Sequence, residues 1–305
     1  MLADNFSALL KKKILDTGAS ACGFAQAEIL ENDLAFLNQW VKRGFHALKD
    51  YLEKDTEKRA DPRLVSPNAK SVISVLYNYF NEDTLPEAQH YRISRYAHGR
   101  DYHDVIKERL GPVVDFITTE TRSKNTQLFV DSGPVLEKAW AKLAGNGWIG
   151  KNTLLINEKY GSFNFIGTII TDIKLDYDTS VPNNCGDCNL CIEACPTVAL
   201  SDDSGLDVRK CISNFTMQKN TELPTAIRDK FNNYIYGCDI CQDVCPWNKN
   251  IESGKSIFPV SEKLKALKKE DFENLTEDEF DKIFSDSAIR WIGYKTLKRN
   301  IDFLK

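Results

Sequence analysis

The chain has 305 residues, of which 42% are hydrophobic and 28% are charged, and its formal net charge is −4. Such a composition is that of a globular protein with room for one large domain or two. It excludes a uniformly basic nucleic-acid binder, although a local basic patch is compatible with it. No apolar run approaches the roughly 20 residues of a membrane-spanning helix. Residues 1–20 lack the apolar core of a signal peptide, so we expect a cytoplasmic protein with no membrane partner.

The first part of the chain alternates between helical and strand-like patterns, which predicts an α+β fold with an N-terminal α/β domain over residues 1–178. Helices are expected over residues 6–17, 34–41, 102–121 and 135–144, and strands over residues 71–79, 127–130, 153–156 and 163–173. Proline cannot donate the hydrogen bond that a helix interior needs, so Gly111-Pro112 should kink or break its helix. The last two strands are expected to pair across the turn at Tyr160-Gly161.

Asp131 stands directly after the strand 127–130 and before Gly133-Pro134. A carboxylate at the end of a strand can line a ligand site. It can also cap the helix that begins near Pro134, and position alone favours the cap.

Two further segments of this domain are candidates for a site. Residues 94–103, SRYAHGRDYH, gather two histidines, two arginines and two tyrosines, which is typical of a site lining. Residues 145–153 contain three glycines, whose backbone amides can approach and cradle a ligand. This segment is not a Walker loop, because Asn152 follows Lys151 where serine or threonine is required.

Eight of the nine cysteines fall between residues 185 and 245, and their spacing predicts two 4Fe–4S clusters. The run CxxCxxCxxxCP has the bacterial ferredoxin pattern, in which the fourth cysteine ligates the other cluster. With crossed ligation, one cluster would be held by Cys185, Cys188, Cys191 and Cys245. The other would be held by Cys195, Cys211, Cys238 and Cys241. Disulfides or structural zinc fit this spacing less well.

The cysteines define a ferredoxin-like module over residues 179–250, which marks the protein as an electron-transfer device. The ninth cysteine, Cys22, lies among small apolar residues and is expected to be a buried structural thiol.

Residues 251–305 form a short C-terminal segment with helical patterns. Over residues 288–305 an apolar stripe alternates with the cations Arg290, Lys295, Lys298 and Arg299, which predicts one basic amphipathic helix. We expect the stripe to pack on the protein and the cations to point outward. The cationic face is then either a solvated surface or a phosphate-contacting one, and both interpretations stay open.

Taken together, these segments resemble the epoxyqueuosine reductases, cobalamin-dependent iron–sulfur enzymes of tRNA queuosine synthesis. The resemblance covers most of the chain and runs through KRADPR, SRYAHGRDYH, FVDSGPVLEKAWAKLAGNGWIGKNTLL, GSFNFIG, CGDCNLCIEACPTVAL, RKCIS, IYGCDICQDVCPWN and SAIRWIGYKTLKRN.

The resemblance implies a base-off cobalamin between the N-terminal domain and the cluster module. Asp131 matches the family's proton donor, which sets the capping interpretation aside. Positions near the corrinoid are matched by Arg59, Gly150, Lys151, Asn152 and Ser213. To act as an acid at neutral pH, Asp131 would need a pKa raised by burial.

The implied reaction is the reduction of epoxyqueuosine to queuosine at the wobble position of a tRNA, with electrons from an external donor. The substrate gives the C-terminal cations a role as tRNA contacts. We expect a monomer.

Two features depart from the family pattern. Lys138-Ala139 replaces the usual arginine-proline after the glutamate of the DSGPVLE block. The helical-repeat region of longer relatives is also missing after residue 305, so other residues should supply its tRNA contacts. The alternative functions are a reductive dehalogenase-like corrinoid enzyme and a plain ferredoxin-type electron carrier.

Overall fold

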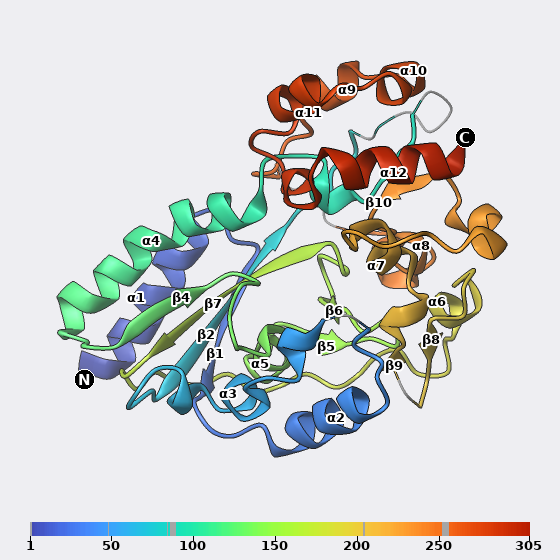
Figure 1. The fold of residues 1–305 in the computed structure, drawn as a ribbon. Coiled ribbons are helices and arrows are strands. Elements are labelled where there is room, and N and C mark those ends of the chain that lie inside the picture. The colour runs from blue at the N-terminus through green and yellow to red at the C-terminus, as the bar shows by residue number, and fades with distance from the viewer. Residues whose placement is uncertain (1, 48, 84, 86–89, 204, 252–255) are drawn as a thin grey trace.

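The sheet at the centre of the molecule is four-stranded and wholly antiparallel, with strand order β1-β2-β7-β4 (Figure 1). The computed structural model describes residues 2–47, 49–83, 85, 90–203, 205–251 and 256–305. The strands are β1 (Ala21–Gln26), β2 (Ser71–Asn78), β7 (Asn164–Thr171) and β4 (Thr126–Phe129). The two inner strands are buried along nearly their whole length, as strands covered on both faces must be.

Helices cover both faces of this sheet. On one face α1 (Leu2–Asp16) and α4 (Tyr102–Thr121) pack against the strands through a core that includes Leu10, Ile106 and Ile169. On the other face lie α2 (Glu31–Lys42), α3 (Thr56–Ala60) and α5 (Glu137–Leu143), and their core includes Trp140 and Ile170. Ile169 and Ile170, which are neighbours in β7, thus pack in cores on opposite faces of the sheet, because successive side chains of a strand point to opposite faces.

Close packing of α4 on the sheet depends on one glycine. A Cβ atom at Gly167 would lie 2.7 Å from Leu110 Cδ1 and 3.1 Å from Ile106 Cγ2, so a side chain there would push the helix away. The predicted helix over residues 102–121 runs through Pro112 without interruption, so a break there is wrong, and a kink stays a prediction. Burial of one whole face of α4 on the sheet outweighs the local cost of proline.

The predicted pairing of strands 153–156 and 163–173 is also wrong. Instead, β6 (Leu155–Ile156) pairs with β5 (Trp148–Ile149), and β7 pairs with β2 and β4. Only an isolated bridge joins Asn157 to Gly161 across the expected turn, among the residues described. The eight-residue strand β7 buries more surface in the central sheet than the two-residue strand β6 could offer it.

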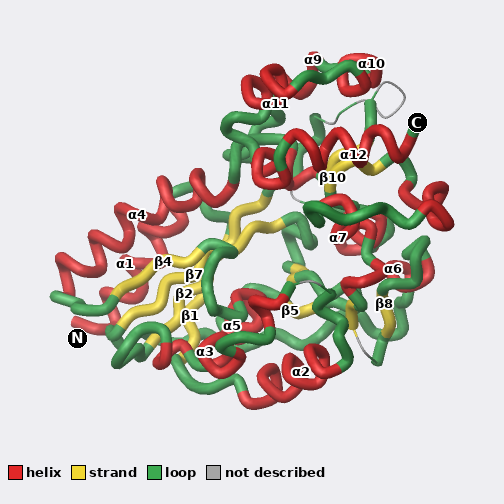
Figure 2. The backbone as a smooth tube through the Cα atoms, viewed as in Figure 1, coloured by secondary structure: helices red, strands yellow, loops and turns green. Residues whose placement is uncertain are grey.

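The cysteine-bearing region consists mostly of loops and very short elements (Figure 2). Its elements are α6 (Leu190–Glu193), β8 (Leu200–Ser201), β9 (Gly205–Leu206), α7 (Ile212–Met217), β10 (Tyr234–Tyr236) and α8 (Ile240–Asp243). It is tied to the first half of the chain, because β10 pairs in parallel with β3 (Arg92–Ile93).

The C-terminal segment forms α9 (Glu262–Ala266), α10 (Lys269–Glu273), α11 (Glu277–Ile283), a 3₁₀ helix η7 (Ala288–Ile292) and α12 (Tyr294–Leu304). These helices share a core with Tyr91, Ile93 and Tyr236. The predicted single helix over residues 288–305 is divided, since Gly293 has φ +77° and ψ 161°, a conformation that only glycine adopts readily. None of the helices described combines the length and the apolarity that crossing a bilayer would demand.

Candidate active site

Asp131 lies in the loop that joins β4 to α5, with a left-handed backbone conformation of φ +56°. Its backbone N–H donates to Glu137 Oε2 at 2.9 Å, and its side chain is 68% exposed. The residue that caps α5 is Leu136, which makes no side-chain capping bond, so Asp131 is not the helix cap that its position favours. The strained loop instead presents the carboxylate to the surface.

His103, in the first turn of α4, bridges two carboxylates. Its Nδ1 is 2.7 Å from Asp101 Oδ1, and its Nε2 is 3.5 Å from Asp131 Oδ2. Burial lowers the pKa of His103, but the hydrogen bonds that its ring donates to Asp101 and Asp131 outweigh burial and raise the pKa to about 9. At neutral pH His103 is therefore an imidazolium.

The same contact fixes the charge of Asp131. The hydrogen bond from His103 holds the pKa of Asp131 below its usual value and outweighs burial, which acts in the opposite direction. The expected rise of this pKa depends on burial against the corrin and stays a prediction for the cofactor-bound protein. The proton of the pair resides on His103, a role that the sequence did not reveal.

Glu137, the acceptor of the Asp131 amide, is a second carboxyl group beside the loop. Burial raises its pKa to about 8, and the charge of Asp131 contributes in the same direction. Glu137 therefore carries a proton over most of the neutral range. Because Glu137 is neutral in this range, it does not place a second full negative charge next to Asp131.

Arg59 is brought to the same loop. Its guanidinium donates to Gly133 O at 3.3 Å and to Tyr51 O at 3.0 Å, and it lies 5.5 Å from the centre of the Tyr51 ring. Burial lowers the pKa of Lys49, while the charges of Asp131 and Cys211 raise it.

The other predicted cofactor positions lie on the cysteine side. Lys151 Nζ donates to Asn189 Oδ1 at 2.9 Å and to Asp202 Oδ2 at 3.1 Å, which joins the glycine-containing turn to the cysteine loop. Ser213, at the start of α7, donates its hydroxyl to Met217 Sδ at 3.7 Å. The described contacts do not connect these two positions directly to Asp131.

Buried polar atoms without a partner mark all three segments that the family resemblance assigns to the corrinoid. They are Arg59 Nε, Asn152 Nδ2, and both amide atoms of Asn214 next to Ser213, none of which has a hydrogen-bond partner within the described structure. Such atoms are rare in folded proteins because each one costs free energy. A ligand rich in amide groups, as a corrinoid is, would satisfy both donors and acceptors of this kind.

The cysteines predicted to hold the first cluster lie near one another. Burial raises the pKa of Cys245, and the charges of Cys185 and Cys188 raise it further. Burial likewise raises the pKa of Cys191, to which Cys245 and Cys185 contribute. Cys245 is thus beside the first run of cysteines, although some 50 residues separate them in the chain.

The remaining four cysteines form a second group. Burial raises the pKa of Cys238 to about 12, with further contributions from Cys211 and Cys195. Burial also raises the pKa of Cys241, to which Cys238 and Cys211 add their charges. All nine cysteines are free thiols, as cluster ligation requires. Cys22 is half-buried and lies apart in β1, and burial raises its pKa to about 11.

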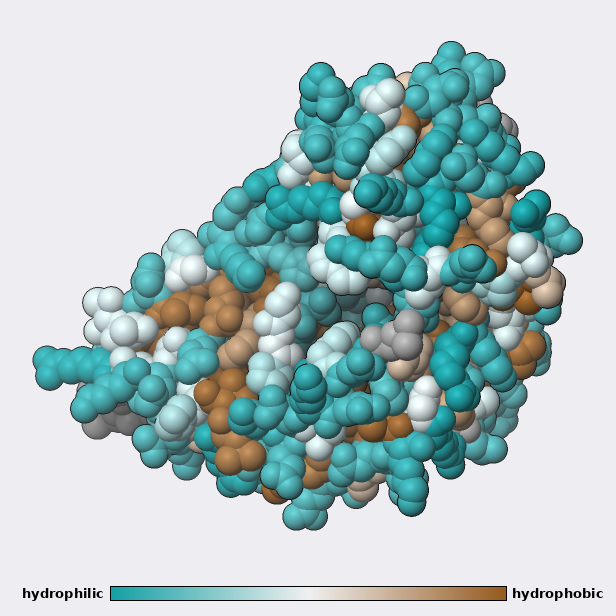
Figure 3. All heavy atoms as spheres, viewed as in Figure 1, coloured by the Kyte–Doolittle hydropathy of each residue, from teal (hydrophilic) through white to brown (hydrophobic). Residues whose placement is uncertain are grey.

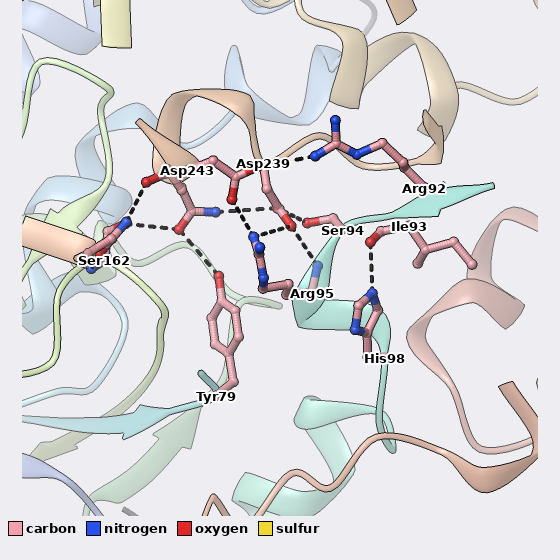
Figure 4. A network of polar contacts seen from close by, with 11 residues as sticks. Tyr79, Arg92, Ile93, Ser94, Arg95, His98, Ser162, Asp239 and Asp243 are labelled. Carbon is pink, nitrogen blue, oxygen red and sulfur yellow. Dashed lines mark hydrogen bonds and ion pairs between the residues drawn. The ribbon is translucent and has the colours of Figure 1, made fainter. Parts of the chain in front are cut away.

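A polar network anchors the 94–103 segment to Asp239 and Asp243, in the stretch of chain that also carries Cys241 (Figure 4). Asp239, between Cys238 and Cys241, accepts the hydroxyl of Ser94 and, at 2.7 Å, the backbone N–H of Arg95. Because this segment leads directly into His103, the network holds the acid side of the site in a fixed relation to the cysteines.

A second part of the network ties α8 to the central sheet. Gln242 Oε1 accepts the hydroxyl of Ser162 at 3.0 Å and that of Tyr79 at 3.5 Å, and Asn248 donates to the Gln242 carbonyl at 2.8 Å. The cysteine loop is therefore fixed on the end of the sheet.

The four C-terminal cations have different environments. Lys295 is exposed, whereas Lys298 donates to Glu273 O at 2.6 Å. Arg299 points inward and donates to the carbonyls of residues 215, 218 and 221 at 2.7–3.0 Å, so the expectation that all four cations point outward is wrong for this residue. Arg290 pairs with Asp101 and Asp104 at 3.5 and 3.0 Å, on the acid side of the site.

The fold and the cysteines define a two-cluster iron–sulfur protein with an attached sheet domain. The family model of the "4Fe-4S double cluster binding domain" matches residues 184–248. A second model, "Epoxyqueuosine reductase QueG, DUF1730", matches residues 59–132, which include Arg59, His103 and Asp131.

The curated epoxyqueuosine reductase of Cellulophaga algicola is 43% identical over 99% of both chains. A solved epoxyqueuosine reductase bound to a tRNA-Tyr epoxyqueuosine-modified stem loop is 29% identical, with a TM-score of 0.89 over 98% of this chain and 80% of that one. The Bacillus subtilis enzyme, with its catalytic aspartate loop swung out of the active site, is 29% identical, with a TM-score of 0.86 over 98% and 81% of the two chains.

This chain belongs to the epoxyqueuosine reductase family, and it is an enzyme. The predicted mixed helix-and-sheet fold with its double-cluster domain is confirmed. Family membership favours the reductase over the dehalogenase and carrier alternatives.

Proposed function

We propose that this protein reduces epoxyqueuosine to queuosine at the wobble position of a tRNA, with cobalamin bound base-off and electrons from two 4Fe–4S clusters. Two electrons and two protons are consumed as the epoxide opens and its oxygen leaves as water, and an alkene remains. The observation that carries the proposal is the Asp131–His103 pair, in a domain that Ser94 and Arg95 join to Asp239, between Cys238 and Cys241.

Bound cobalamin would supply a reduced cobalt centre that gives electrons to carbon. The residues that would hold it are Arg59, the turn 150–152 and Ser213, with the unpartnered amide of Asn214 beside them. The charge of Lys49 interacts with those of Asp131 and Cys211, and a positive charge there would favour the arrival of electrons. The eight cysteines of the two groups would hold about eight irons, by the count of two cubanes.

Opening the epoxide builds negative charge on its oxygen, and a positioned acid lowers the cost. Asp131, exposed at the tip of its loop, would meet that oxygen and deliver to it a proton taken up from His103, which holds the proton of the pair. The relative with its catalytic aspartate loop swung out supports a loop that moves between states. In this chain the Glu137 contact to the Asp131 amide would hold the loop in the position that the structure shows.

Asp131→Asn tests this assignment. The variant should retain the fold, both clusters and cobalamin, but lose on the order of a hundredfold to ten-thousandfold in turnover of epoxyqueuosine-containing tRNA, because general-acid catalysis contributes about that much. Ser132→Ala, in the same exposed loop, is the matched control and should turn over at the normal rate. An Asp131→Asn variant with wild-type turnover would show that another group supplies the proton.

A further inference from the structure

Trp291 is 57% exposed, although its place in the sequence assigns it to the buried stripe of a helix. The cause is Gly293, whose left-handed φ of +77° ends η7 and separates Trp291 from the face that α12 buries. Leu297 and Ile301 of α12 are wholly buried. An indole left in water at this level of exposure loses the free energy that its burial would gain.

A cation lies over the exposed ring, and a second follows it closely in the chain. Lys219 Nζ is 4.7 Å from the ring centre of Trp291, in the geometry of a cation–π contact. Lys219 is itself exposed, and so is Lys295 in the first turn of α12, four residues after the tryptophan. We call Trp291, Lys219 and Lys295 the Trp291 patch.

Three acids in this part of the molecule are paired with cations outside the patch. Asp101 and Asp104 pair with Arg290, the residue before Trp291, at 3.5 and 3.0 Å. Asp302 lies farther along α12 and pairs with Lys298 and Lys305, at 3.4 and 3.5 Å. An exposed aromatic ring with exposed ammonium groups is the surface that single-stranded nucleic acid prefers.

The patch is linked to the acid by a continuous chain of contacts. Arg290, next to Trp291, pairs with Asp101, which holds His103, which in turn contacts Asp131. Lys219 follows α7, which begins directly after Cys211. The patch therefore lies at the border of the proposed active site, where the sheet domain, the cysteine region and the C-terminal segment meet.

We propose that Trp291 stacks on a base of the tRNA anticodon loop that flanks the nucleotide being reduced, while Lys219 and Lys295 contact the adjoining phosphates. A nucleotide turned into an active site leaves its neighbour without a stacking partner, and an aromatic ring can replace that partner. This inference rests on the proposed function, since it requires that the substrate be a tRNA loop.

The test is the dissociation constant of an unmodified tRNA anticodon stem-loop, measured by fluorescence anisotropy over a series of salt concentrations. Cluster-loaded protein is used throughout. Trp291→Ala should weaken binding roughly tenfold at every salt concentration, because lost stacking removes no ionic contact. Trp291→Phe should restore most of the affinity. Phe36→Ala on α2, which removes an aromatic side chain that is 53% exposed, is the matched control and should bind as wild type does.

The two lysines should behave differently from the tryptophan. Lys219→Gln and Lys295→Gln should each reduce the slope of log affinity against log salt by about one, as expected for one lost phosphate contact. If Trp291→Ala binds as tightly as wild type while wild type still binds the stem-loop, the stacking inference is wrong and the proposed function survives. If wild-type protein fails to bind the stem-loop, both are overturned.

Discussion

His103 keeps its proton because carboxylates face both nitrogens of its ring. Its pKa of about 9 compares with an ordinary value near 6.5. Asp131→Asn removes one of the two acceptors, so we expect the pKa of His103 to fall. An NMR titration can measure it directly, since the chain has only four histidines and His103→Gln identifies the signal. An unchanged titration in Asp131→Asn would mean that the two side chains do not interact in solution.

The sign of the effect on stability follows from the raised pKa. The stabilisation contributed by the His103 contacts is complete below the unfolded pKa near 6.5, and it is lost as pH rises through about 9. Turnover should fall over the same upper range if His103 resupplies the proton. A turnover profile that stays flat to pH 10 would contradict this role.

Single residues differ in how much the sequence says about them. The family resemblance leads to Asp131 and Arg59, and the structure places both at one loop. The contact between His103 and Asp131 joins residues that are 28 positions apart in the chain. The sequence pattern of neither segment predicts this contact. Glu137 and Lys49 likewise acquire their altered pKa values only from burial and neighbouring charges, which depend on the fold.

At the scale of elements, α12 is fastened to the cysteine region by Arg299 rather than by its apolar stripe alone. Burial lowers the pKa of Arg299, whose guanidinium donates hydrogen bonds to backbone carbonyls at the end of α7 and directly after it. Arg299→Gln should lower the free energy of unfolding by about 1–3 kcal/mol, since it leaves buried carbonyls without donors. Lys295→Gln should change it by less than about 0.5 kcal/mol, because that lysine is exposed. Anaerobic denaturant titrations measure both, and equal stabilities would show that Arg299 is not structural.

Element types could be predicted wherever the periodic pattern was long. The helices α1, α2, α4 and α5 and the strands β2, β4 and β7 lie close to their predicted ranges. Strand β1 was missed, because ACGFAQ carries no β-branched residue and forms its strand through pairing with β2. The pairing of β6 with β5 depends on tertiary burial, and the division of the last helix depends on the backbone conformation of Gly293. The periodic pattern of apolar residues contains neither kind of information.

At the scale of the whole molecule, the cores do not follow the order of the chain. Phe258, which belongs to the C-terminal segment, packs in the core of the sheet domain, and Tyr91 packs among the C-terminal helices. The parallel pairing of β3 with β10 joins the first half of the chain to the cysteine region. Apolar side chains gather over the sheet near β4, whereas the surface of the C-terminal helices is mostly hydrophilic (Figure 3). The boundaries at residues 178 and 250 stay a prediction. The shared cores and the β3–β10 pairing favour electron transfer, because they fix the cysteines relative to Asp131.

Conversion of epoxyqueuosine to queuosine in tRNA is the measurement that bears most directly on the proposed function. Anaerobic, cluster-loaded protein is supplied with a reductant and with epoxyqueuosine-containing tRNA, in the presence and absence of added cobalamin. The nucleosides are then analysed by mass spectrometry. We predict a product that has lost one oxygen atom, formed in the cobalamin-loaded sample alone. Equal conversion by protein free of cobalamin, or no conversion when both clusters and cobalamin are present, would contradict the proposed function.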